Sequence, residues 1–153
     1  MNKFICFCIF FLYCGPTMTI SSGFKLNQEK ILWPEDIPKL VFVEIFSGHV
    51  PLNQQATEMW KNRISELGFK VTEIYENAEG IFQGNIVGEA STIWIDAHIS
   101  IRLINVKNNL TLWSVEAHDP RLFSWTASIN ESMRYAIKEG IKALKKDLIA
   151  QMK

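Results

Sequence analysis

The sequence predicts an α/β (α+β) fold, a two-layer sandwich in which a mixed sheet with a long antiparallel hairpin carries two main helices on one face. Two observations carry this prediction. Residues 93–118 have the alternating pattern of an amphipathic hairpin, and the segments 53–67 and 128–149 repeat apolar residues at helical spacing. The 153 residues suffice for one domain with a modest core.

The N-terminus has the pattern of an export signal. Lys3 supplies a positive charge, an unbroken apolar run covers residues 4–13, and Gly15 and Pro16 end it. The run is shorter than the about 20 apolar residues that a membrane-spanning helix needs. We therefore expect a secretory signal, with an uncleaved membrane anchor as the alternative.

Two processing sites compete at the end of this signal. Cys14 stands where a lipoprotein signal places its acceptor cysteine, although Tyr13 is larger than the residue that usually precedes such a cysteine. The alternative is cleavage after Gly23, where Ser21 and Gly23 supply small side chains. No cysteine occurs from Gly15 onward, which excludes a disulfide framework. A single cysteine at the end of a signal has a known use, so we expect Cys14 to be lipidated.

The chain divides into a signal segment over residues 1–14, a tether over 15–38 and a single domain over 39–150. The tether is polar, contains three prolines and has neither a helical nor a strand period. We therefore expect it to lead into the fold without regular structure.

The first part of the domain predicts a strand, a helix and a second strand. Residues 39–46 contain the run Leu40–Phe46, which is apolar on both faces apart from Glu44, as in a buried central strand. A helix is expected from Asn53, a good N-cap residue, with Gly68 as its C-terminal stop. Residues 69–75 then have the pattern of a strand.

Residues 77–91 are expected to form a loop with at most a short helical turn. They hold Gly80, Gly84 and Gly88, and no lysine follows the last glycine. This spacing matches neither a dinucleotide-binding fingerprint nor a phosphate-binding loop. Backbone flexibility is the role that we expect of these glycines.

The hairpin has the clearest pattern in the chain. In its first strand, apolar residues alternate with mostly polar ones, so one face is expected to be buried and the other solvated. A three-residue turn at 107–109 would place Arg102 opposite Ser114. The same turn would place His98 opposite His118.

The polar face of the hairpin gathers Asp96, His98, Glu116 and His118. Two histidines and a carboxylate are a ligand set for zinc, but a sheet with one solvated face presents the same residues without binding a metal. We therefore assign no metal, cofactor or catalytic residue to the chain. His98→Ala and His118→Ala are expected to change stability by less than about 0.5 kcal/mol, as exposed substitutions do.

The last element is a helix over residues 128–149, with Ser128 and Glu131 as a capping box. The loop before it contains the large apolar residues Leu122, Phe123 and Trp125. Exposed, these three side chains would contact a partner. Buried, they would close the core, which is the commoner arrangement for such residues.

Charge and known motifs exclude several classes of function. The formal net charge is zero, which removes the general attraction expected of a nucleic-acid-binding protein. The chain has no Gly-x-Ser-x-Gly elbow, and the predicted domain has no cysteine to act as a nucleophile. We therefore expect a protein that is not an enzyme.

The order of elements resembles the curli-production assembly lipoprotein (CsgG-like) family. The strand at 97–106, the return strand at 110–114 and the step Gly68-Phe69-Lys70-Val71 carry the resemblance. The penicillin-binding-protein activator LpoB and the N-terminal domain of TolB are similar at this level. The chain is too short to contain the pore-forming hairpins of the curli protein, so the resemblance does not imply a channel.

The resemblance implies an exported, non-catalytic lipoprotein of the bacterial cell envelope that serves as an accessory or adaptor for a protein partner. With an acylated Cys14 it would lie on the periplasmic side of the outer membrane, and otherwise it would be periplasmic or secreted. Two alternatives stay open. One is a subunit of an outer-membrane secretion or assembly oligomer, with a homo-oligomer as the simplest case. The other is a small metal-binding protein or hydrolase that uses the polar hairpin face.

Overall fold

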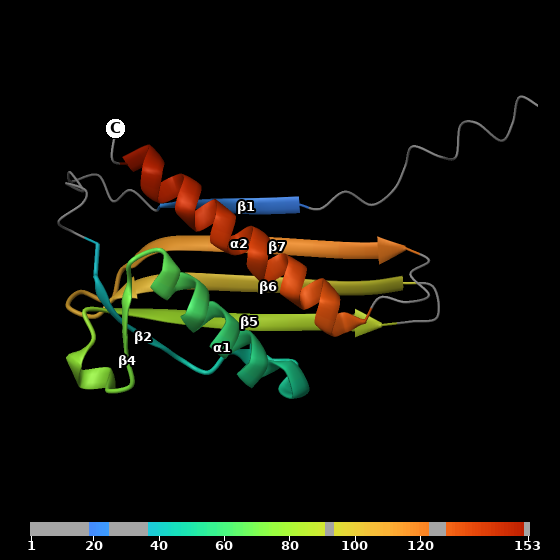
Figure 1. Ribbon diagram of the computed structural model, residues 1–153, viewed down its shortest axis with the longest axis horizontal. Helices are drawn as coiled ribbons and strands as arrows, with labels where there is room; N and C mark the ends of the chain where they lie inside the picture. The colour runs from blue at the N-terminus through green and yellow to red at the C-terminus, as the bar shows by residue number, and fades with distance from the viewer. Residues whose placement is uncertain (1–18, 25–36, 91–93, 123–127, 152–153) are drawn as a thin grey trace, which may run out of the picture.

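The computed structural model describes residues 19–24, 37–90, 94–122 and 128–151. In chain order the elements are β1 (Thr19–Phe24), β2 (Leu40–Val43), β3 (Ser47–Gly48), α1 (Val50–Glu66), β4 (Lys70–Thr72), the 3-10 helix η1 (Tyr75–Asn77), β5 (Gly80–Ala90), β6 (Trp94–Asn105), β7 (Thr111–Leu122) and α2 (Ile129–Gln151). Both helices lie on one face of a single mixed sheet (Figure 1), which confirms the predicted fold class. No helix within the described ranges is long and apolar enough to cross a membrane.

The sheet has seven strands in the order β1-β7-β6-β5-β2-β4, and β3 also pairs with β5. Strands β5, β6, β7 and β1 pair antiparallel, whereas β2 pairs parallel with both β5 and β4. The strand predicted at 39–46 is present as β2, which covers only Leu40–Val43. The predicted strand at 69–75 is reduced to β4, because η1 begins at Tyr75.

Strand β1 corrects the tether prediction, which expected no strand in residues 15–38. Residues 19–24 pair antiparallel with β7, from Thr19 opposite His118 to Phe24 opposite Trp113. The segment has no obvious strand period because it forms an edge of the sheet and has only one neighbouring strand. Even Ile20 keeps 39% of its surface exposed.

Strand β5 corrects the loop prediction for residues 77–91. Its three glycines lie on the helix-covered face, where other segments occupy the space that side chains would need. A Cβ atom at Gly80 would lie 2.4 Å from Cγ of Pro38, and one at Gly84 would lie 2.6 Å from the ring of Phe46. A Cβ at Gly88 would lie 2.9 Å from Cγ2 of Ile129. These glycines therefore provide room for close packing.

The β6–β7 register confirms the prediction. Arg102 lies opposite Ser114, and His98 lies opposite His118. The connection itself is longer than predicted, since β6 ends at Asn105 and β7 begins at Thr111. The connection is longer by one residue on each side, so the register of these pairs is unchanged, and a register shift lies between Leu103 and Ile104.

Helix α1 begins at Val50, three residues before the predicted start. His49 is the N-cap and a proline lies in the first turn, where its missing N–H costs no hydrogen bond. The predicted stop at Gly68 is confirmed. Gly68 adopts a φ of 99° and its N–H donates to the carbonyl of Ser65, while Phe69 N–H donates to that of Ile64. This is the usual glycine-terminated helix end.

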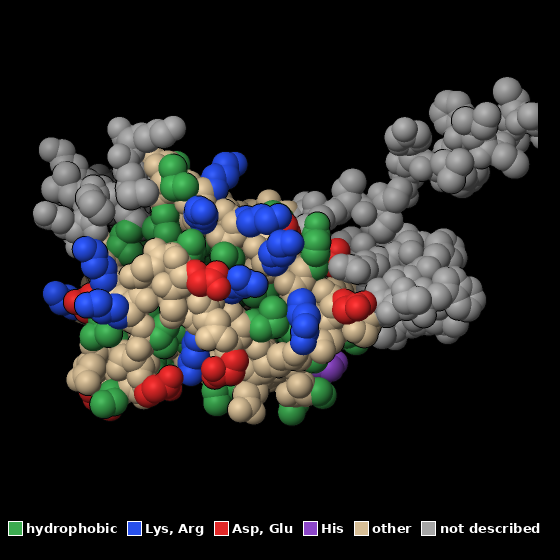
Figure 2. All heavy atoms as spheres, in the orientation of Figure 1, with side chains coloured by type: hydrophobic (Ala, Val, Ile, Leu, Met, Phe, Trp, Pro, Cys, Tyr) green, Lys and Arg blue, Asp and Glu red, His purple; other side chains and the backbone are tan. Residues whose placement is uncertain are grey.

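Helix α2 begins as predicted. Ser128 N–H donates to Glu131 Oε2 and Glu131 N–H donates to Ser128 Oγ, both at 3.3 Å. These reciprocal bonds form the capping box. Over α2, Lys and Arg side chains are spread along the exposed side of the helix with few acidic side chains among them (Figure 2), as on a solvated surface.

The core lies between the helices and the sheet. Trp60 of α1 stacks on Trp113 of β7 with ring centroids 6.3 Å apart, and both are fully buried. The indole N–H of Trp113 donates to Asp147 Oδ2 of α2 at 3.0 Å, which ties the helix to the sheet.

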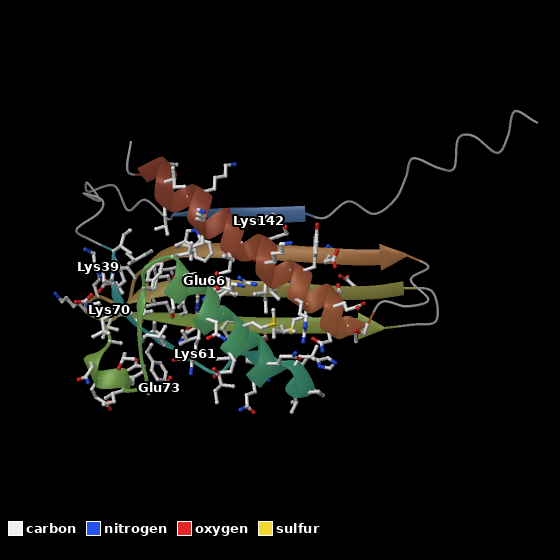
Figure 3. All side chains as sticks on the ribbon, in the orientation of Figure 1. Lys39, Lys61, Glu66, Lys70, Glu73 and Lys142 are labelled. Atoms are coloured by element: carbon white, nitrogen blue, oxygen red, sulfur yellow. The ribbon has the colours of Figure 1, made fainter. Side chains whose placement is uncertain are left out.

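At the edge of the domain, Nζ of Lys61 in α1 lies 3.2 Å from a carboxylate oxygen of Glu73, which follows β4 (Figure 3). Burial lowers the pKa of Lys61, but its bonds to Glu73 and Glu58 outweigh this and raise the pKa overall.

Candidate functional site

Most of the face of the sheet opposite the helices is polar and open among the described residues, although Tyr75 of η1 packs edge-on against Phe42 at its β2 end. Residues of β6 that point away from the helices alternate with the buried residues of the same strand, so they line up with those of β5 and β7. Two groups of side chains stand out on this face. One is the histidine group predicted from the hairpin, and the other surrounds a pocket near β2 and β3.

The predicted histidine group lies together on the sheet. Nε2 of His118 is 2.6 Å from Oδ2 of Asp96, and the ring of His98 lies edge-on to that of His118 with centroids 5.9 Å apart. Glu116 lies opposite Ser100. Across the described parts of the chain, no three His, Cys, Asp or Glu residues are arranged to hold a metal ion.

The histidines are less exposed than the sequence predicted. His98 and His118 are both half-buried, since neighbouring strands flank them on both sides. Oδ1 of Asp96 is buried without a hydrogen-bond partner among the described residues. Among the described residues, Asp96 therefore has only His118 as a side-chain hydrogen-bond partner. The prediction that His118→Ala leaves stability nearly unchanged assumed an exposed side chain, and His118 is not fully exposed.

The second group is built on an irregularity between β2 and β3. Val43 pairs with Phe82 and Ser47 pairs with Asn85, so three residues on one side oppose two on the other. The extra residue lets Phe46 turn into the core over Gly84, whereas Ile45 turns outward and is 74% exposed. Such bulges commonly redirect side chains beside binding sites.

A pocket of about 320 Å³ opens at this bulge on the uncovered face. Its lining combines one acid, one base, amides, hydroxyls and an apolar residue: Glu44, Ile45, Ser47, Gln83, Gly84, Asn85, Ser100 and Arg102. Gln83 lies directly opposite Arg102 on the neighbouring strand, and Asn85 lies directly opposite Ser100. The floor is therefore fixed by two adjacent cross-strand pairs.

This pocket was not predicted from the sequence. Its one visible signal was Glu44, the single charge in an otherwise apolar segment. The other predicted sites fall outside what the structure describes. Cys14, Phe123 and Trp125 lie outside the described residues, and Leu122 is the last residue of β7.

The sequence matches no protein-family model and no curated protein. Solved structures do share the fold. PelC from Paraburkholderia phytofirmans, solved as a dodecamer, has a TM-score of 0.58 at 14% identity, over 84% of this chain and 98% of that one. Lipoprotein GNA1162 from Neisseria meningitidis has a TM-score of 0.53 at 11% identity, over 71% and 99%. A DUF4136 family protein from Bacteroides thetaiotaomicron has a TM-score of 0.52 at 9% identity, over 88% and 98%. The TM-scores show a shared fold, and at such low identities they show the fold alone. A bacterial lipoprotein is among the proteins that have this fold.

Proposed function

We propose that this protein is an exported lipoprotein of the bacterial cell envelope, anchored through an acylated Cys14 on the periplasmic side of the outer membrane. Within this proposal it is a non-catalytic accessory or adaptor protein of the CsgG-like, LpoB-like or TolB-like kind, and its partner is another envelope protein. The proposal rests chiefly on the position of β1 in the sheet.

Strand β1 supports processing at Cys14 over cleavage after Gly23. Cleavage after Gly23 would remove residues 19–23, which are nearly the whole of the strand that pairs with β7. It would also leave the edge of β7 unpaired along the same length. Processing at Cys14 keeps β1 intact and places the acyl chains a few residues before Thr19.

The shared fold adds support for an envelope role. GNA1162 is described as a lipoprotein, and this chain covers nearly the whole of it. The start of β1 and the end of β7 lie at the same end of the sheet (Figure 1). The end of β7 and the start of α2, which residues 123–127 connect in the sequence, both lie at that end. We therefore place the partner contact proposed for Leu122, Phe123 and Trp125 on the membrane-facing end of the domain.

The anchoring proposal is tested by the mass and location of the mature protein. The wild type, expressed in a bacterium that processes lipoproteins, is expected in the membrane fraction with an acylated N-terminal cysteine. Cys14→Ser is expected to leave the precursor unprocessed or to release the protein from the membrane. Cys8→Ser, within the signal, is the matched control and keeps the acylated mass. A soluble mature protein that begins at Phe24 would contradict the proposal.

A homo-oligomer is the second candidate, because PelC has this fold and forms a dodecamer. Light scattering on the detergent-solubilised, full-length protein tests it directly. A mass several times that of the protomer is the expected result for an assembly subunit. A monomer at all concentrations would leave the adaptor as the better proposal.

A further inference from the structure

The pocket between the β2–β3 bulge and strands β5 and β6 presents several hydrogen-bond donors on its floor. Oδ1 of Asn85 accepts from the hydroxyl of Ser47 at 3.0 Å, and Oε1 of Gln83 accepts from Nε of Arg102 at 3.0 Å. Each amide oxygen therefore already accepts one hydrogen bond inside the protein. The amide nitrogens of Gln83 and Asn85 have no partner among the described residues, and an amide nitrogen can only donate.

Arg102 adds a charged donor in a fixed position. Its bond to Gln83, directly opposite on β5, uses only Nε. The two terminal nitrogens have no partner within the described parts of the chain, and the side chain is exposed. A guanidinium held in this way offers parallel N–H groups that match the two oxygens of a carboxylate.

Glu44 and Ile45 limit what can accompany such an anion. The Glu44 carboxylate lines the same pocket and can only accept hydrogen bonds when ionised, so it disfavours a second negative charge and favours a neighbouring N–H or O–H group. The exposed side chain of Ile45 gives a small apolar wall. A volume of about 320 Å³ is at the lower end for ligand sites, so it fits one residue or one sugar.

We infer that this pocket binds a single carboxylate with a hydrogen-bond donor beside it. Arg102, Gln83 and Asn85 donate to the carboxylate, and Glu44 accepts from the adjacent donor. Two sources have this chemistry: the C-terminal residue of a peptide, whose own amide N–H lies next to the carboxylate, and a sugar acid. The inference goes beyond the proposed anchoring and does not depend on it, because every residue involved lies on the uncovered face of the sheet.

The experiment titrates the full-length, ¹⁵N-labelled protein with N-acetylalanine and with glucuronate, and it follows the Nε–H signal of Arg102 by NMR. At least one of the two acids is expected to shift that signal with saturation, and the one that binds identifies the source. N-acetylalanine amide and glucose, which lack the carboxylate, are expected to bind at least about tenfold more weakly, because they lose a charge-assisted hydrogen bond. No saturable shift with either acid would overturn the inference, as would equal binding of the uncharged analogues.

Variants locate the binding by calorimetry or backbone NMR. Arg102→Gln is expected to weaken the acid that binds by at least about tenfold. Gln83→Glu places a carboxylate next to Arg102 and is expected to block binding while Arg102 stays in place. Arg134→Gln is the matched control, since Arg134 is an exposed arginine on α2 that bonds to Asn130. A loss in the control, or unchanged binding in both pocket variants, would show that the acid binds elsewhere.

Discussion

Strands β5 and β6 lie side by side along their whole length, from Gly80 opposite Asn105 to Ala90 opposite Ile95, yet they build the core in opposite ways. The helix-facing residues of β6 include Ala97, Ile99, Ile101 and Leu103, all at most 1% exposed. Every second helix-facing residue of β5 is a glycine, and side chains from other segments fill the space above it. Strand β6 therefore fills the core with its own side chains, whereas the glycines of β5 leave space for side chains from neighbouring segments.

The comparison is tested most strongly by removing volume from β6. Ile101→Ala is expected to lower the free energy of unfolding by about 3 kcal/mol, because it deletes buried methylene and methyl groups and leaves a cavity. Urea unfolding followed by circular dichroism measures the change. Ser114→Ala, on the uncovered face of β7, is the control and should stay within about 0.5 kcal/mol. Equal effects of the two changes would mean that β6 does not fill the core in this way.

Strand β5 should respond to the opposite change. Gly84→Ala is expected to lower the unfolding free energy by about 2 kcal/mol, because the new Cβ would collide with the ring of Phe46. The matched control is Gly23→Ala in β1, where a Cβ would meet no atom within 4 Å.

A double mutant sharpens the test of β5. In a Phe46→Leu background the ring is gone, so Gly84→Ala should cost less than it does in the wild type. The difference between the two costs, measured from the same urea curves, is the coupling between positions 46 and 84. If the two changes are additive, the glycine is not there to make room for the ring.

The side of the sheet away from the helices gives smaller effects. His118→Ala is expected to cost about 1 kcal/mol, because it removes the hydrogen bond to Asp96, whose other oxygen is already unpartnered. His98→Ala, which breaks no described hydrogen bond, should cost less than about 0.5 kcal/mol. Thermal unfolding at neutral pH compares the two variants, and a larger loss for His98 would reverse this assignment.

The smallest effect is expected at Val87, which lies opposite His98 and is 46% exposed. Val87→Thr keeps the β-branched shape and should change the unfolding free energy by less than about 0.5 kcal/mol. A large loss, again by urea unfolding, would mean that this face is covered in solution by something that the described residues do not include.

The same contrast explains how much of the fold could be predicted. Strand β6 carries both its buried and its polar residues in its own sequence, so alternation reveals the strand and its register with β7. In β5 the buried Phe82 and Ile86 alternate with glycines, and the groups over the glycines come from Pro38, Phe46 and Ile129. The sequence of β5 therefore shows only part of the buried face, and its alternation is hidden. β1 escaped prediction for a related reason, since an edge strand buries too little to show a period.

The two candidate sites differ in the same respect: alternation in the sequence revealed the histidine group but not the pocket. Alternation alone placed His98, His118 and Asp96 on one face, because side-chain direction in a strand has a period of two. The pocket depends on the extra residue between β2 and β3, and on which amide oxygens are already bonded. These are properties of the pairing, and a single charged residue, Glu44, was their only trace in the sequence.

The pairing of β1 with β7 also has a consequence for the order in which the chain folds. Thr19 and His118 lie about a hundred positions apart, so their contact closes a very long loop and is expected to form late. If the protein is exported N-terminus first, β1 emerges almost at once but has no partner until β7 follows. During that interval the edge of β1 is open to other chains, which makes it the segment most in need of a chaperone during transport.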